Sequence, residues 1–558
     1  MRPALLSVVL CVAALGCREE AAVVPVVDAG LPPPPPPAEL ELDSGAPEPP
    51  KQPEWFEVAP IPQRLERVAT ELVTHADDAE FEPQIFPDDY ALVDGVLTFR
   101  GGPARTGGAW GTIPKNPSKL EIAWQLKTGR SKAPWFGGVG WTGQPAIVRW
   151  PAVIRHSMPK LGRFRRDEGL VEVIQGSLDG HVYFLDLFTG QRTRKPINTG
   201  NPIKGSVSVD PRGYPLLFVG QGIPEKPNLG LHVYELIEHT EVFLLPGRDK
   251  DAPRPWGAFD SSGLLNRKTD TYFAPGENGL FYFLKLNTVF DPVALTLDVK
   301  PQVTRYRYSQ LKQREFGIEN SISIARNLAF FADNGGNIQA MDLRTFQPVW
   351  SFDAGDDTDA SLTLELEDGA PVLYTGCEVD KTGPKGKTHL RKLSGLDGTQ
   401  RWEVTYPCLG ARSPKKIDAG MFATNAVGTG DVAHLVFFTL SRCPGPEDGK
   451  LLALDKATGK EVWRIDLPHY AWSSPTLLKD PDGHTFLLQG DITGMVHLYD
   501  ARDGREVASL KLPGEIEASP AAFDDRLVLG ARNDTIYGLR IVGGPVEPAP
   551  AQSVKGQR

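Results

Sequence analysis

A short strand–turn–strand phrase recurs along the chain and constrains the fold more than any other feature of the sequence. The clearest copy is LLALDKATGKEVW at 451–463. Eight copies lie roughly 40–60 residues apart, a spacing typical of solenoids and propellers. The copies begin at His181, Leu231, Phe281, Ile338, His389, Leu451, Val496 and Ile536.

Each copy has the pattern of two antiparallel strands joined by a tight turn. Leu452 and Leu454 alternate with other residues at the two-residue period of a strand, and Thr458-Gly459 marks a hairpin in which glycine takes a positive φ. Two further strand-like runs precede the copy, as SSPTLLKD and HTFLLQGD do in the seventh unit. The pattern therefore predicts an all-β fold, an eight-bladed β-propeller of four-stranded antiparallel blades over residues 95–543.

The ends of the propeller are also readable. The last copy, IYGLRIV, runs directly into GGPVEPAPAQ and has no partner strand of its own. A strand-like run, LEIAWQL at 120–126, lies near the start of the chain. We expect this N-terminal strand to complete the last blade, because closing the ring removes exposed sheet edges.

The phrase ALD-x-x-TGKEVW resembles the repeat of the pyrroloquinoline-quinone (PQQ) propellers. In that family the repeat tryptophan docks on the neighbouring blade, and Trp350, Trp402 and Trp463 match its position, with Phe243 as a substitute in the second copy. The stretch LTFRGGPARTG at 97–107 is similar to the segment that enters the first blade. The resemblance covers about the same residues as the predicted propeller and is specific for the fold rather than for chemistry.

Two functions follow from the resemblance. The outer-membrane assembly lipoproteins of this type are non-enzymatic scaffolds, and we expect this function, with no cofactor and no catalytic residues. The alternative is a PQQ- and calcium-dependent quinoprotein dehydrogenase, in which a tryptophan floor, a disulfide between adjacent cysteines and Glu, Asn and Asp side chains surround the quinone. The sequence contains no adjacent cysteine pair. A third reading is recognition of a carbohydrate or peptide on one face of the propeller.

The N-terminal residues predict export and a lipid anchor. Residues 1–17 combine Arg2, an apolar run and the ending Ala-Leu-Gly-Cys, which resembles a bacterial lipoprotein signal with Cys17 as the lipidated residue. An ordinary secretory signal is the alternative. Arg18 is not an acidic retention signal, which favours the periplasmic face of the outer membrane.

The segments around the predicted propeller differ in composition. Residues 18–53 include six consecutive prolines and predict a disordered tether. Residues 54–94 predict a lead-in with a short helix, in which Leu65, Val68 and Leu72 share one face. Residues 544–558 predict a disordered tail. The formal charge of −10 and pI near 5.6 argue against nucleic acid as a partner and leave an envelope protein as the expected one.

Three cysteines remain once a signal and an anchor are set aside: Cys377, Cys408 and Cys443. In a four-stranded blade, the loop after the second strand and the exit from the fourth strand lie on the same face. Cys377 and Cys443 follow second strands, and Cys408 follows a fourth strand between them. We therefore expect a structural disulfide between Cys408 and either Cys377 or Cys443.

Three polar segments are candidates for binding. The stretch DAGDDTDA supplies Asp353, Asp356, Asp357 and Asp359, which could bind Ca²⁺, but its spacing does not match an EF-hand loop, and a solvated acidic loop is favoured. The basic insertion 155–166 with Phe164 could contact anionic lipid or an acidic partner, although a solvated loop is again favoured. His469 has no Ser-His-Asp context and is interpreted as a loop residue. No metal site is expected.

Overall fold

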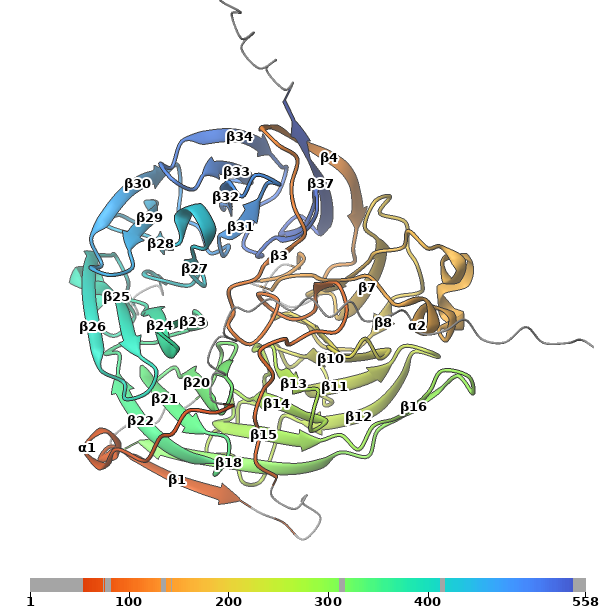
Figure 1. The fold of residues 1–558 in the computed structure, drawn as a ribbon, viewed down its shortest axis with the longest axis horizontal. Helices are drawn as coiled ribbons and strands as arrows, with labels where there is room; N and C mark the ends of the chain where they lie inside the picture. Colours follow the sequence, from red (N-terminus) through yellow and green to blue (C-terminus); the bar gives the residue numbers. More distant parts are fainter. Residues whose placement is uncertain are drawn as a thin grey trace, which may run out of the picture. The chain divides into compact units, whose positions relative to one another are not determined.

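The described residues form an eight-bladed β-propeller (Figure 1). The computed structural model describes residues 54–73, 75, 82–131, 137–141, 143–310, 317–411 and 417–544. The predicted signal with Cys17, the tether 18–53 and nearly all of the tail lie outside these ranges. Within them, no helix is apolar and long enough to cross a lipid bilayer. The all-β, eight-bladed prediction is confirmed.

Blades 1 to 4 follow one another along the first half of the ring, each with its strands in sequence order from the axis outward. Blade 1 contains β5 (Ala146–Val148), β6 (Glu172–Gly176), β7 (His181–Asp186) and β8 (Ile197–Asn198). Blade 2 contains β9 (Ser208–Val209), β10 (Leu216–Gly220), β11 (Gly230–Glu235) and β12 (Thr240–Pro246). Blade 3 contains β13 (Leu264–Asn266), β14 (Thr271–Pro275), β15 (Leu280–Lys285) and β18 (Gln302–Gln310). Blade 4 contains β19 (Ser323–Ala325), β20 (Leu328–Ala332), β21 (Asn337–Asp342) and β22 (Gln347–Asp353).

Blades 5 to 8 complete the ring, and the eight repeat copies fall on the third strand of each blade. Blade 5 contains β23 (Thr363–Glu367), β24 (Ala370–Gly376), β25 (Lys387–Ser394) and β26 (Gln400–Pro407). Blade 6 contains β27 (Ala426–Val427), β28 (Leu435–Ser441), β29 (Gly449–Asp455) and β30 (Glu461–Leu467). Blade 7 contains β31 (Thr476–Lys479), β32 (Thr485–Gly490), β33 (Met495–Asp500) and β34 (Glu506–Lys511). Blade 8 contains β35 (Ala521–Phe523), β36 (Arg526–Ala531), β37 (Thr535–Gly543) and β4 (Pro117–Lys127).

The N-terminal strand closes the ring as predicted. β4 includes residues 120–126 and pairs antiparallel with β37, so the fourth strand of blade 8 comes from the start of the chain. Two short strands flank the axis on either side of the entry segment: β2 (Gly95–Val96) pairs with β5, and β3 (Ala109–Trp110) runs parallel to β35. A separate hairpin of β16 (Val289–Asp291) and β17 (Thr296–Asp298) extends from blade 3.

The expected helical face of Leu65, Val68 and Leu72 is wrong. The helix α1 (Pro62–Leu65) ends at Leu65, and β1 (Val68–Val73) pairs with β18 as a fifth strand outside blade 3. Val68 and Leu72 pack against the core between blades 3 and 4. Residues four apart share a face both in a helix and in a strand. The segment is a strand because it forms backbone hydrogen bonds with the outer edge of β18.

The other helical segments are short. In blade 1, α2 (Ala152–His156) and the 3₁₀ segment η1 (Pro159–Arg166) lie between β5 and β6. The 3₁₀ turns η2 (Gly383–Lys385) and η3 (Gly430–Val432) lie in blades 5 and 6.

The centre of the ring is filled by the entry segment 97–108, which we call the hub (Figure 1). Its backbone carbonyls accept hydrogen bonds from the inner strands of four blades. The pairs are Leu97 with Val209, Pro103 with Ile324, Ala104 with Leu364 and Gly108 with Ala522, at 2.8–3.0 Å. These contacts reach blades 2, 4, 5 and 8.

Two buried arginines of the hub reach the remaining blades. Arg100 donates through its guanidinium to the carbonyls of Asn425 in blade 6 and Pro475 in blade 7, and its backbone amide donates to Gln144 Oε1 at the start of blade 1. Arg105 donates to the carbonyl of Ser262 at the start of blade 3, at 2.7 Å. The hub therefore contacts all eight blades.

A belt of hydroxyl groups links each blade to the next around the hub. A residue just before the inner strand of one blade donates its amide to a Ser or Thr hydroxyl in the next. These pairs are Gln144–Ser206, Ser262–Ser321, Ser321–Ser361, Ser361–Thr424, Thr424–Ser474 and Ser474–Ser519, at 2.7–3.2 Å. Ser262 Oγ donates to the Ser206 carbonyl, and the Ser519 amide donates to the Gly143 carbonyl, which completes the circle.

The tryptophans of the repeat lie between neighbouring blades. Each donates its indole N–H to a carbonyl of the next blade and covers the glycine of that blade's turn. For the three tryptophans that the sequence singled out, the contacts are Trp350 with Gly395 and Gly398, Trp402 with Lys456 and Gly459, and Trp463 with Ala501 and Gly504. Trp124 on β4 makes the same contact with Leu187 and Gly190 of blade 1.

The turn glycine is required for this packing. At Gly459, φ is +71°, and a Cβ would lie 2.8 Å from the Trp402 ring. The turn itself is closed by Asp455, which accepts hydrogen bonds from the amide and hydroxyl of Thr458 at 2.9 and 2.6 Å. The repeated phrase therefore builds a capped hairpin whose glycine receives the preceding blade's tryptophan.

Candidate binding site at the mouth of the axis

One face of the propeller collects most of the ionisable and aromatic side chains near the axis. The connections that leave the second and fourth strands of every antiparallel blade lie on this face, here called the top face. It receives residues from separate loops: Asp260, Glu319 and Trp472 follow fourth strands, and Glu277 and Arg442 follow second strands. The site is therefore assembled from several blades.

A small pocket lies on the axis at the top face. Its wall consists of belt residues, three carboxylates, two aromatic rings and an amide: Ser206, Ser321, Ser361, Thr424, Ser474, Asp260, Glu319, Asp359, Phe99, Phe422 and Asn320, together with Gly143 and Gly205. Phe99 belongs to the hub. The space open to the centres of water molecules is about 40 Å³, enough for a few waters or an ion.

The first acidic cluster contains Asp260, Glu277 and Glu319 around Lys204. The Lys204 ammonium pairs with Asp260, and the Asn334 amide donates to Glu319 at 2.8 Å. The Trp256 indole, partly exposed at the top face, donates to Glu277 at 2.7 Å. Each member of this cluster therefore has one partner, and Oδ1 of Asp260 and Oε1 of Glu277 accept no hydrogen bond within the described chain.

Burial and charge set the protonation of this cluster. Burial, with the neighbouring carboxylates Glu319 and Asp260, raises the pKa of Glu277 well above its usual range. Burial also acts on Glu319, but Lys204 holds the pKa of Glu319 below its usual value. Burial opposes the ammonium of Lys204, yet the carboxylates around it raise its pKa. These opposite shifts of pKa favour a proton on Glu277 beside an ionised Glu319 and a charged Lys204.

The segment 353–359 is not the solvated loop that the sequence favours. Asp353 is exposed, but Asp356 is buried, and Asp357 and Asp359 are partly buried. Asp357 lies with Glu378 and Asp380 in a second acidic cluster beside the first. A loop that crosses from the rim of one blade to the axis of the next has an exposed end and a buried end, which explains the difference.

The end of the axis at the top face is here called the mouth. On the side of the mouth opposite the first acidic cluster, the side chains are aromatic and cationic. Trp141 and Phe422 lie 6.1 and 5.4 Å from the Trp472 ring. The Arg442 guanidinium stacks 3.8 Å from the Tyr470 ring, and Arg532 lies 5.0 Å from Trp141. Stacked rings and guanidinium groups of this kind are typical of surfaces that bind another molecule.

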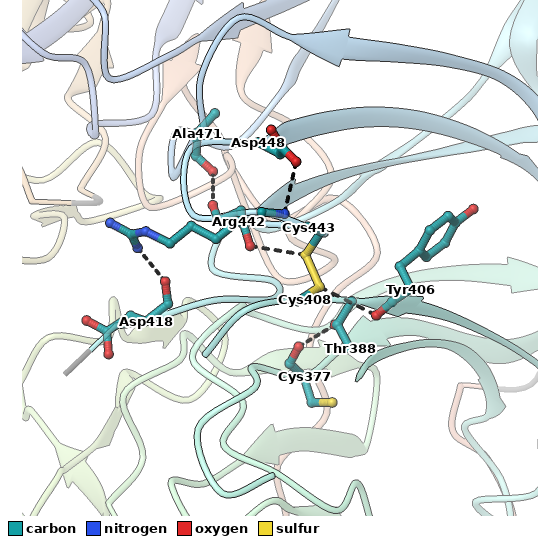
Figure 2. Close-up of a disulfide and its surroundings, with 11 residues drawn as sticks. Cys377, Thr388, Tyr406, Cys408, Asp418, Arg442, Cys443, Asp448 and Ala471 are labelled. Atoms are coloured by element: carbon teal, nitrogen blue, oxygen red, sulfur yellow. Dashed lines mark hydrogen bonds between the residues drawn. A yellow bond between two sulfur atoms is a disulfide. The ribbon is translucent and has the colours of Figure 1, made fainter. Parts of the chain in front are cut away.

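A disulfide supports this sector (Figure 2). Cys408, after β26, is bonded to Cys443, after β28, with a Cα–Cα distance of 4.0 Å. Cys377 is a buried free thiol close by. Arg442 is adjacent to Cys443 and donates to the Asp418 carbonyl, so the disulfide holds the loop that presents Arg442 to Tyr470.

Of the remaining sequence candidates, His469 packs its ring 4.7 Å from the Tyr470 ring of the aromatic sector, whereas the basic insertion lies on blade 1. His469 is in the β30–β31 connection, and its Nδ1 accepts a hydrogen bond from the Tyr470 amide at 3.0 Å. In the basic insertion, Phe164 is buried and Arg155 is almost fully buried, so the segment folds over blade 1. The expected solvated loop is therefore wrong for its apolar side, whereas Arg163 and Arg166 are exposed.

The residues at the axis do not fit PQQ. The pocket is small for a three-ring quinone, and the ring that the hub contributes to its wall is Phe99 rather than a tryptophan. The disulfide joins residues 35 positions apart and does not line the pocket. Asn320, Glu319 and Asp359 do offer metal-type oxygen donors, but we derive no redox step through them.

Comparison with known proteins agrees with the repeat architecture. A family model described as outer membrane protein assembly factor BamB matches residues 447–546. Over these residues the repeats of the propeller are similar to the PQQ type. BamB of Burkholderia pseudomallei is 27% identical over 219 residues, which are 37% of this chain and 47% of that protein, so the match spans about half the length of the relative.

Solved structures share the fold of this PQQ-repeat propeller. Quinohemoprotein alcohol dehydrogenase of Pseudomonas putida HK5 has a TM-score of 0.54 at 12% identity and covers 82% of both chains. The enzyme of the same name from Comamonas testosteroni has a TM-score of 0.53 at 13% identity and covers 84% of both. At this identity the likeness concerns the fold alone.

Sequence reasoning missed most of the mouth. Glu277, Glu319, Glu378 and Asp380 stand alone in the sequence and match no motif. Their common signal is position, because Glu277, Glu378 and Asp380 closely follow the end of a second strand, and Glu319 lies in the connection after a fourth strand. Counting carboxylates at those positions around the ring would have found them.

Proposed function

We propose that this protein is a non-enzymatic lipoprotein of the bacterial cell envelope whose propeller is a protein-binding scaffold. In this proposal Cys17 carries the lipid anchor at the periplasmic face of the outer membrane, and residues 18–53 separate the propeller from the membrane. The observation that carries the proposal is the mouth of the axis, a mixed aromatic and charged surface above a pocket that the hub closes. The similarity to BamB supports the same function.

Crosslinking in cells tests the scaffold. A photoreactive amino acid replaces Trp472 at the mouth or, as a matched control, Val462 on β30, which is exposed at the outer edge of blade 6. We expect light-dependent capture of one envelope protein from position 472 and not from position 462. Capture of nothing at 472, or of the same proteins at both positions, contradicts a binding surface at the mouth.

The dehydrogenase alternative, with PQQ and Ca²⁺, is supported by fold similarity alone. Titration of residues 54–558 with PQQ and Ca²⁺, followed by tryptophan fluorescence, tests it. We expect no saturable quenching. Quenching that saturates and requires Ca²⁺ would contradict the scaffold proposal and lead to assays with alcohols and sugars.

A further inference from the structure

The face of the propeller opposite the mouth, here called the bottom face, carries the connections that leave the first and third strands of each blade. Four aliphatic side chains are well exposed on the part of this face that belongs to blades 1 to 3: Leu92 (57%), Val153 (58%), Val289 (68%) and Val293 (90%). Val153 lies in α2, and the last two belong to the hairpin of β16 and β17. Figure 1 shows α2 and β16 on the same side of the ring.

The turn between β9 and β10 brings these side chains into one surface. The Leu92 amide donates to a carbonyl at the start of this turn at 2.7 Å. A Cβ at Gly213, in the middle of the turn, would lie 3.6 Å from the ring of Pro151, which directly precedes α2. At the end of the turn, the Tyr214 ring lies 4.9 Å from the Phe290 ring of the hairpin. The four aliphatic side chains therefore lie around one turn of blade 2.

The hairpin of β16 and β17 is held in a fixed shape. The Asp291 carboxylate accepts hydrogen bonds from the amides of Val293 and Ala294 at 2.8 and 2.9 Å. Phe290 packs against the cores on both sides of blade 2. Because successive residues of a strand point to opposite sides, Val289 points away from these cores. The two valines are thus presented to solvent by an element that is anchored in the propeller.

A basic surface lies beside these aliphatic side chains on blade 1. The segment 149–166 contains six arginines and lysines and no acidic residue, although the formal charge of the chain is −10. Arg163 and Arg166 are exposed on η1. Arg163 donates to Oε1 of Gln191, which joins η1 to the connection from β7 to β8, where Arg192 is also exposed. Several cationic groups therefore gather at this edge of the bottom face.

Acidic side chains are also present on the bottom face, and their positions show where an anion can approach. Asp167 and Glu168 directly follow η1, and Asp291 and Asp298 lie in the hairpin. The hairpin therefore offers apolar contact without positive charge, whereas the arginines of η1 and of the β7–β8 connection supply the attraction for anions.

Residues near the start of the described chain lie at the same face. The Phe56 amide donates to Oδ1 of Asn327 at 2.7 Å, in the turn between the first and second strands of blade 4. A tether that precedes residue 54 therefore leaves from the bottom face, and the mouth opens on the other side of the ring.

We propose that the bottom face of blades 1 to 3 binds an anionic phospholipid surface, with Val153, Val289 and Val293 among the headgroups and Arg163 and Arg166 on the lipid phosphates. Projecting apolar side chains with basic side chains beside them are typical of proteins that lie on a membrane surface. Protein-binding surfaces are instead enriched in aromatic rings, which gather at the mouth. The proposal rests on these side chains, and it depends neither on the lipid anchor nor on the scaffold function proposed above.

Vesicle binding by the full chain with Cys17→Ser tests the proposal, because serine at this position cannot carry the lipid anchor. A fluorescent amino acid whose emission shifts to shorter wavelength in apolar surroundings replaces Val293 or, as a matched control, Val462 at the outer edge of blade 6. With vesicles of phosphatidylcholine and phosphatidylglycerol, we expect a saturable shift at position 293 and none at position 462. With phosphatidylcholine alone, we expect at least ~10-fold weaker binding.

Two pairs of substitutions test the contribution of charge, with the label at position 293. Arg163→Ala with Arg166→Ala should weaken binding to the anionic vesicles roughly 30-fold. Arg401→Ala with Arg464→Ala removes the same charge from exposed positions on blades 5 and 6, and we expect unchanged binding. No shift at the hairpin label, or equal shifts at the hairpin and control labels, would overturn the proposal. Equal weakening by the two pairs would also overturn it, because net charge alone would then decide binding.

Discussion

The hub and the mouth lie next to each other on the axis and treat buried polar groups in opposite ways. In the hub, Arg100 and Arg105 are almost fully buried, and their guanidinium groups donate to backbone carbonyls of four blades. At the mouth, Glu378 is a buried carboxylate with an oxygen that accepts no hydrogen bond in the described chain. The buried guanidinium groups of the hub hold the blades together, whereas the carboxylates of the mouth are available to bind a ligand.

This difference separates stability from function within one axis. A buried donor whose hydrogen bonds are all made is costly to remove, because its partners are left unsatisfied. A buried carboxylate held without a donor is costly to keep, and its replacement by a neutral isostere relieves that cost. Substitutions in the two regions are therefore expected to have opposite effects on the free energy of unfolding.

The largest expected effect is in the hub. Arg105→Ala removes hydrogen bonds to the carbonyls of Ile322, Phe99 and Ser262. We expect a loss of about 3–5 kcal/mol in the free energy of unfolding, measured by urea denaturation, because several buried carbonyls lose their donor together. Arg163→Ala, at an exposed position of the basic insertion, serves as the control. A loss below about 1 kcal/mol for Arg105→Ala would break the comparison.

The blade interface, distant from the axis, gives the next effect. Trp402→Ala removes a docked ring and its hydrogen bond to Lys456, and we expect a loss of about 3 kcal/mol. Gly459→Ala alone is also destabilising because its Cβ would meet that ring. In a double-mutant cycle, Gly459→Ala should cost less once Trp402 is removed. Additive effects would mean that the ring and the turn do not act together.

A pH-dependent effect is expected at the mouth. Burial raises the pKa of Glu517 from 4.5 to about 7, although Arg532 lies 3.2 Å away. Because the folded state binds this proton more tightly than the unfolded state, stability falls as pH rises from about 4.5 to about 7. Glu517→Gln should remove a pH dependence on the order of 2 kcal/mol. Parallel urea titrations at acidic and neutral pH check this, and an unchanged slope would contradict it.

The smallest expected effect is at Glu277. Its raised pKa keeps it protonated, so Glu277→Gln replaces one neutral group by another, with a change within about 0.5 kcal/mol at pH 5. As the pH rises above the ordinary pKa of a glutamate side chain, the unfolded state loses this proton while the folded state retains it. The free energy of unfolding of the unaltered protein then falls, and Glu277→Gln should become the more stable protein. Thermal unfolding of both proteins at pH 5 and pH 8 measures the difference in stability under each condition. Strong destabilisation at pH 5 would show that Glu277 is ionised.

The sequence predicted what is encoded locally and repeated. Asp455, Thr458 and Gly459 make one capped turn within five consecutive residues, and similar phrases recur around the ring, so the number of blades could be predicted. The β1 strand could not, because a spacing of four residues suits both a helix and a strand. The acidic clusters could not either, because Asp260, Glu277 and Glu319 come from separate loops and become neighbours only when consecutive blades pack together.

The position of the hub in the chain has a consequence for synthesis. Residues 97–127 leave the ribosome before any blade exists, yet they bond to blades that end at residue 543. Until the last hairpin arrives, β4 has no partner and the hub has carbonyls without donors. A polypeptide that ends before the last blade therefore leaves β4 and the hub without their partners, and only a chain synthesised through blade 8 can form the closed ring.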